Sequence, residues 1–186
     1  MVDWTQLVHE HGPLVWQTVY RLVGHGPDAA DCFQNTFIAA MQLARREAVL
    51  HWPAMLKRLA TTQALDCLRR RTRERDHRPR LAEEASRRCV GTPEQIIEQT
   101  ELAEAVRLAL SVIEPRQAEV FCLACLDGWS YGEIGARMGI TVNYVGVLLS
   151  RARAALREQL HAFDPAEKHK KKPENSREHR EPQTGA

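Results

Sequence analysis

The stretch Trp129–Leu156, WSYGEIGARMGITVNYVGVLLSRARAAL, decides the fold class of this sequence. Ser130 can cap a short helix, because its hydroxyl accepts a hydrogen bond from the first free amides of the helix. Gly139 can end that helix, and Thr141 can cap a second one directly afterwards. A short helix, a glycine turn and a second helix in this order predict a helix-turn-helix unit.

The small and apolar residues of this stretch are placed where two crossing helices would pack against each other. Ala136 is small enough to lie at the crossing, and the shared core can be filled by Ile140, Val145 and Leu148. In DNA-binding units of this kind, the second helix enters the major groove with its first residues at the base edges. Two helices that only pack together within an all-helical domain are the alternative.

The DNA-binding interpretation assigns roles to five residues of the second helix. The bases would be met by Thr141, Asn143 and Tyr144, and the phosphates by Arg151 and Arg153.

The rest of the chain also predicts helices, because its apolar residues recur at spacings of three and four and strand patterns are absent. The expected helices run from about Trp4 to Val23, Pro27 to Arg46, Trp52 into an arginine run, Pro93 to Ile113 and 116 to 126. An all-α fold of two small helical domains is therefore expected, at 1–72 and 93–163. A flexible linker at 73–92 would join them, and a disordered charged tail would occupy 164–186.

Composition limits the class of protein. The 186 residues are 44% hydrophobic and 27% charged, which is typical of a soluble globular protein. No segment approaches the roughly 20 apolar residues that span a bilayer, and the first residues do not resemble a signal peptide. We therefore expect a cytoplasmic protein without membrane insertion.

Known catalytic and metal-binding patterns are missing from the sequence. We find no GxSxG, P-loop, HExxH or paired carboxylates in a glycine-rich context, so we expect no enzymatic activity and no cofactor. Cys122 and Cys125 form a CxxC inside the apolar run VFCLACL, but no second pair of ligands accompanies them. Both are expected to be buried small apolar residues, and we expect no metal site.

Basic residues gather in one place, although the formal net charge is only +2. Between Asp66 and Arg80 there are seven arginines and three acidic residues. Such a run suits a nucleic-acid contact, but a solvated helix end or linker carries the same charge pattern. The run does not distinguish these possibilities by itself.

Motifs in both halves resemble the extracytoplasmic-function sigma factors, a branch of the sigma-70 family. The N-terminal half contains DAADCFQNTF at 28–37, which resembles region 2.2, and HWPAMLKRLATTQALDCLRRR at 51–71, which resembles regions 2.3 and 2.4. The C-terminal half contains EPRQAEVF at 114–121 and then the Trp129–Leu156 stretch, which together resemble region 4. The resemblance covers roughly residues 7 to 160.

The resemblance implies a sigma factor that binds core RNA polymerase and directs transcription initiation at particular promoters. Its partners would be the β′ clamp helices and β flap of the core, promoter DNA and an anti-sigma factor. The core-binding residues would be Asp28, Asp31 and Gln34. The −10 promoter element would be melted and held by Lys57, Arg58, Thr61, Thr62, Arg69, Arg70 and Arg71, and the −35 element would be read by the five residues of the helix-turn-helix.

The second helix of the helix-turn-helix departs from the family pattern. The family typically shows a Val-Lys-Ser-Arg-Leu-like stretch, whereas this chain has Val145-Gly146-Val147-Leu148-Leu149. Two cations are therefore replaced by a glycine and an apolar residue. A stand-alone helix-turn-helix regulator, or a sigma-like protein without full promoter recognition, is the alternative function, and reconstitution with core polymerase separates it from a sigma factor.

Overall fold

A computed structural model describes residues 2–77 and 93–161, and every regular element in these two ranges is helical. The expected all-α fold is therefore confirmed. The predicted tail at 164–186 and most of the predicted linker at 73–92 lie outside the described residues. The first domain was predicted to end at residue 72, but its last helix continues as far as His77.

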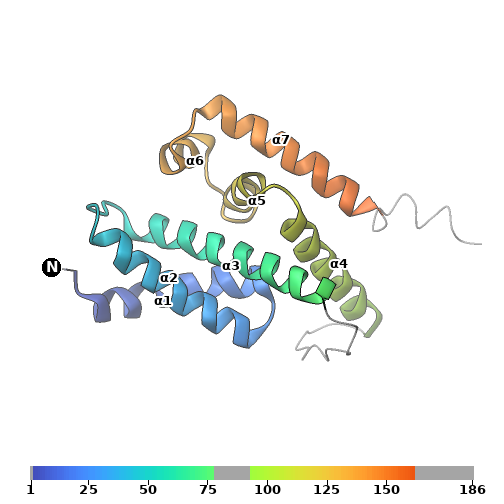
Figure 1. The fold of residues 1–186 in the computed structure, drawn as a ribbon, viewed down its shortest axis with the longest axis horizontal. Helices are drawn as coiled ribbons and strands as arrows, with labels where there is room; N and C mark the ends of the chain where they lie inside the picture. Colours follow the sequence, from blue (N-terminus) through green and yellow to red (C-terminus); the bar gives the residue numbers. More distant parts are fainter. Residues whose placement is uncertain (1, 78–92, 162–186) are drawn as a thin grey trace, which may run out of the picture.

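Three helices form the N-terminal half (Figure 1). Helix α1, Trp4–Val23, is capped by Asp3, whose carboxylate accepts a hydrogen bond from the Gln6 amide at 3.0 Å. Gly24 ends α1 in the left-handed conformation, with a φ of 70° that glycine adopts without steric cost. Helices α2, Gly26–Ala44, and α3, Trp52–His77, complete the bundle.

Helix α3 lies at the centre of the molecule and contacts both halves (Figure 1). On one side it packs against α1 and α2, with a fully buried seam of Leu56, Ala60 and Ala64. On the other side it contacts α4, Pro93–Val112, and α5, Pro115–Phe121. One apolar core continues from the first half into the second through Ala109, Leu110 and Ile113.

The C-terminal half continues with η1, Cys122–Leu126, a π-helical segment, and with α6, Tyr131–Met138, and α7, Val142–Gln159. A second apolar cluster holds the helix-turn-helix together. It consists of Val120, Leu123, Ile134, Val145, Leu148 and Leu149, with Ile140 partly buried against it. The predicted core residues of the unit are therefore confirmed.

The residue at the close approach between α6 and the turn was predicted wrongly. Gly135 is buried there, whereas Ala136 is exposed. A Cβ atom on Gly135 would lie 2.8 Å from the carbonyl oxygen of Ile140, whose amide donates to the Gly135 carbonyl at 3.0 Å. The prediction missed by one residue because the rotation of α6 is set by Ile134, which points into the core.

Candidate nucleic-acid and polymerase interface

Two capping arrangements fix the helix-turn-helix. The Ser130 amide and hydroxyl donate to the Glu133 carboxylate at 2.8 and 2.7 Å, and the Ser130 hydroxyl accepts from the Glu133 amide at 3.3 Å. These hydrogen bonds to its charged form lower the pKa of the Glu133 carboxyl. The Thr141 hydroxyl accepts from the Tyr144 amide at 3.3 Å and so starts α7. Thr141, predicted to meet DNA bases, therefore has a structural role as well.

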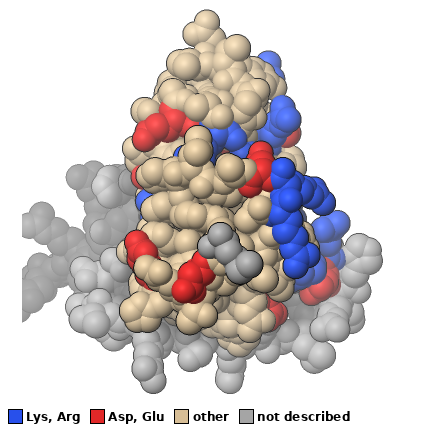
Figure 2. Space-filling view, turned by 90° about the vertical axis from the view of Figure 1, so that its left-hand side faces the viewer, with Lys and Arg blue, Asp and Glu red and all other residues tan. Residues whose placement is uncertain are grey.

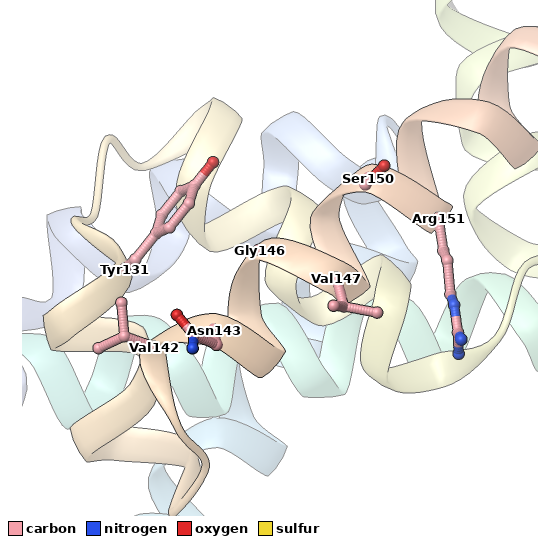
Figure 3. Close-up of a pocket in the computed structure, with 7 residues that line it drawn as sticks. All are labelled: Tyr131, Val142, Asn143, Gly146, Val147, Ser150 and Arg151. Atoms are coloured by element: carbon pink, nitrogen blue, oxygen red, sulfur yellow. The ribbon is translucent and has the colours of Figure 1, made fainter.

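The exposed face of α7 carries a shallow hollow of about 520 Å³ (Figure 3). Asn143 and Arg151 lie on this face together with Val142, Val147 and Ser150. Gly146 leaves the space between them open, and Tyr131 borders it from α6. The structure therefore brings two predicted DNA contacts, Asn143 and Arg151, onto one surface.

Arg153 does not share the face of Arg151. Its guanidinium donates to the sulfur of Cys125 at 3.7 Å, so it lies against the η1 segment. Two residues along a helix differ by about 200° in direction, which separates these arginines on α7. Cys125 is exposed, so the prediction that it would be buried was wrong. Cys122 is buried as predicted, and burial raises the pKa of its thiol to about 12.

The three residues predicted to bind core polymerase lie along α2. Asp31 and Gln34 are exposed, whereas the Asp28 carboxylate is partly buried and lies 3.8 Å from the Arg71 guanidinium of α3. Ile38 and Met41 extend the same strip and are exposed, although both are large apolar residues. Their spacing of four and seven residues from Gln34 places them in line with it.

The residues predicted to bind the −10 element are spread over several faces of α3. Thr61 is fully buried, and its hydroxyl has no hydrogen-bond partner among the residues that the structure describes. The Thr62 hydroxyl donates to the carbonyl of Arg58 at 3.0 Å, and Arg69 pairs with Asp66 at 3.1 Å. The structure therefore does not bring all seven predicted residues together.

On the face shown in Figure 2, basic side chains gather along one edge and acidic ones are scattered.

Two of the predicted −10 residues contact the other half of the molecule. The Arg58 guanidinium pairs with the Glu119 carboxylate of α5 at 2.8 Å and donates to the carbonyl of Arg137. Lys57 lies 4.0 Å from Asp127, whose side chain is only 3% exposed and pairs with Arg21 at 2.7 Å. In this conformation, the charged groups of Lys57 and Arg58 both contact residues of the C-terminal half.

Further contacts join the halves at the other end of α3. The Arg107 side chain of α4 lies over Gly24 and donates to the carbonyl of Leu22 at 3.0 Å. The hydroxyls of Thr72 and Ser111 are 2.8 Å apart. The two halves therefore meet along the length of α3, which the prediction of two separate domains did not anticipate.

No helix in the described ranges has the length and apolar character needed to cross a membrane. Within these ranges there is also no group of three His, Cys, Asp or Glu side chains placed to hold a metal ion.

Family models match both halves of the chain. The model described as sigma-70 region 2 matches residues 7–74, and the model described as sigma-70 region 4 matches residues 103–156. The chain belongs to the sigma-70 family. The two matched regions coincide with the α1–α3 bundle and with the helices from α4 to α7, so region 2 and region 4 are used below for these halves.

Relatives support the extracytoplasmic-function branch. The ECF RNA polymerase sigma factor SigE of Mycolicibacterium smegmatis is 32% identical over 166 residues, which is 86% of this chain and 62% of that protein. The RNA polymerase sigma factor CarQ of Myxococcus xanthus is 29% identical over 83% of this chain and 87% of its own length. The chain thus spans less than two thirds of the SigE relative.

Solved structures share the fold. CnrH in complex with the cytosolic domain of CnrY is 25% identical, with a TM-score of 0.52 over 87% of this chain and 89% of that one. The sigma factor RpoE in complex with the anti-sigma factor NepR from Bartonella quintana is 21% identical, with a TM-score of 0.53. That match covers 87% of this chain and 99% of RpoE, and it bears on the fold alone.

Proposed function

We propose that this protein is a sigma factor that binds core RNA polymerase and directs initiation at particular promoters, without catalysing a reaction itself. The observation that carries the proposal is the joint presence of two parts in one chain. Region 4 holds a capped helix-turn-helix with an exposed reading face on α7, and region 2 holds an exposed polar and apolar strip on α2. A stand-alone regulator needs only the first of these parts.

Reconstitution tests the proposal. The purified chain is mixed with core polymerase and a library of promoter fragments, and specific open complexes are measured with and without core. A sigma factor opens DNA only together with core. Specific DNA binding by the chain alone, unaffected by core, would instead support the stand-alone regulator.

The α2 strip is proposed to dock the coiled β′ clamp helices. Asp31 and Gln34 supply polar contacts, while Ile38 and Met41 supply apolar area next to them. Such a combination is typical of an interface, because apolar anchors give affinity and charges give orientation. Asp28 is on the same helix, but its carboxylate faces Arg71 of α3 and so contributes less to the exposed strip.

Asp31→Lys is expected to weaken core binding about tenfold, because it reverses a charge on an exposed docking face. The melting temperature should stay unchanged. Glu10→Lys changes another exposed acid, on α1, and is the matched control, which should leave core binding intact. Affinity for core is measured by titration with a labelled chain. Equal effects of the two substitutions would exclude the α2 strip as the docking surface.

Contacts with the −10 element are proposed for Lys57, Arg58 and the exposed Arg70, but they require a change of conformation. Arg58 can meet a phosphate only after leaving Glu119, and Lys57 only after leaving Asp127. We propose that regions 2 and 4 separate when the protein binds DNA, because separation would free both basic side chains. Thr61 stays in the core and is proposed to support α3 rather than to touch bases.

Arg151 is proposed to contact a phosphate of the −35 element, whereas Arg153 is not. Arg151→Ala is expected to reduce the slope of log affinity against log salt by about 0.9, the contribution of one phosphate contact. Arg153→Ala removes the same charge but lies against Cys125, so the slope should stay unchanged. Binding of holoenzyme to a selected promoter is titrated at several salt concentrations. An equal loss for both variants would mean that general charge, and not a placed contact, sets the slope.

We further propose a cytoplasmic location and an anti-sigma partner. Core polymerase and DNA, the proposed partners, are both cytoplasmic. CnrH, which is 25% identical to this chain, was solved in complex with the cytosolic domain of CnrY. This complex supports the proposal that the present chain also has a protein partner.

A further inference from the structure

The hollow on α7 is lined by regularly spaced residues of that helix. Two neighbouring rows of residues at spacings of four run along the exposed face of the helix. One row is Val142, Gly146 and Ser150, and the other is Asn143, Val147 and Arg151. Gly146 stands in the middle of the first row, so a notch opens between side chains that project on either side (Figure 3).

The notch is apolar where it is open. Val142 is 52% exposed and Val147 is 43% exposed, and both line the hollow. A Cβ atom on Gly146 would lie 3.8 Å from the ring of Tyr131, so the tyrosine forms the wall on the α6 side. The lining carries no charge before Arg151, at its far end. This part of the surface therefore offers no cation to a phosphate.

The surroundings of the notch suit the major groove of a DNA duplex. A helix-turn-helix directs the first residues of its second helix to base edges, and Val142 and Asn143 are the first two residues of α7. The apolar group that a base pair displays in the major groove is the 5-methyl group of thymine. Asn143 offers the amide that can pair with adenine, and Arg151 offers a cation for the flanking phosphate. An apolar helix of a protein partner would leave that amide and cation without matching groups.

We propose that the notch around Gly146 receives the 5-methyl group of a thymine in the −35 element, with Val142 and Val147 as the specificity-determining contacts. Asn143 reads an adenine next to that thymine. This inference rests on the proposed sigma-factor function. It assigns a base preference to two positions that depart from the family pattern: Gly146, where the pattern has lysine, and Val147, where it has serine.

The test removes single methyl groups from DNA. Holoenzyme selects promoter duplexes from a pool with a randomised −35 element, and each thymine of the selected element is then replaced by deoxyuridine. At one position this replacement should lower affinity about fourfold, the factor that corresponds to burial of one methyl group. Deoxyuridine at the other positions should have little effect.

Val147→Ala should abolish the penalty for deoxyuridine at that position, because the valine that contacts the methyl group is gone, while its melting temperature should match that of the unaltered chain. Val112→Ala is the matched control, because Val112 is an exposed valine on α4, away from the hollow. Its deoxyuridine penalty should remain fourfold. The inference is overturned if no deoxyuridine lowers affinity, or if the penalty persists in Val147→Ala.

The same experiment separates failure of the inference from failure of the proposed function. A holoenzyme that selects a −35 element but tolerates every deoxyuridine refutes only the thymine contact. A chain that opens no promoter with core refutes the sigma-factor function, and the inference falls with it. Loss of core binding in Val147→Ala, without a change in base preference, would show that the hollow receives protein.

Discussion

Ile134→Ala is expected to lower the free energy of unfolding of region 4 by about 2–5 kcal/mol. Ile134 is fully buried in the small cluster that joins α6 to α7, so its loss leaves a cavity at the centre of the helix-turn-helix. A unit of this size has few other apolar contacts to compensate. Discrimination between −35 sequences should fall together with stability, because α7 is positioned by this cluster.

Ile38→Ala provides the matched control, since it removes the same atoms from an exposed position on α2. Its effect on unfolding should be within about 0.5 kcal/mol, as for most surface substitutions. Under the proposed function it should weaken core binding instead. Urea unfolding and core titration on both variants make the comparison. Similar unfolding curves for the two variants would contradict the assignment of Ile134 to an essential core.

Glu119→Arg is expected to separate region 2 from region 4. The substitution replaces the Arg58–Glu119 ion pair, at 2.8 Å, with two guanidinium groups in the same place. Like charges at an interface cost free energy, and nearby contacts such as Arg21–Asp127 do not relieve the repulsion. Small-angle scattering should show a more extended molecule. Arg58 should then be available to DNA even before core binds.

Combining Arg58→Glu with Glu119→Arg restores an ion pair with the charges exchanged, and the compact form should return. The coupling energy of the two sites should be about 0.5–3 kcal/mol, the range for residues in direct contact. Glu158→Arg, at an exposed position on α7, controls for net charge and should leave the scattering unchanged. A compact molecule in all variants would show that the halves are held by the apolar core alone.

Sequence patterns predicted the helices closely where local chemistry determines them. Asp3, Ser130 and Thr141 cap helices through their own side chains, and Gly24 and Gly139 end helices in left-handed conformations, with φ of 70° and 65°. These interactions involve residues three or four positions apart, so a single segment contains all the information. The core of the helix-turn-helix followed from the same short-range periodicity.

Exposure on the outer faces of helices was predicted less well. Ile38 and Met41 are large apolar residues, but they lie on the surface in line with Gln34. Thr61 was expected at the DNA surface and is buried. Periodicity shows that a helix has an apolar face. The neighbouring helices decide how much of the helix surface is buried, and α3 is covered on more than one side.

The sequence by itself determined the helical class, the helix boundaries, the helix-turn-helix and the resemblance to the sigma-70 family, because each depends on residues close together in the chain. Only the tertiary structure decided that Arg58 faces Glu119, that Asp28 faces Arg71, and that Arg153 lies against Cys125. It also decided that Gly146 opens a notch beside Tyr131. The physical reason is that such pairs form between helices whose relative rotation and depth are set by packing over the whole core, which local spacing does not encode.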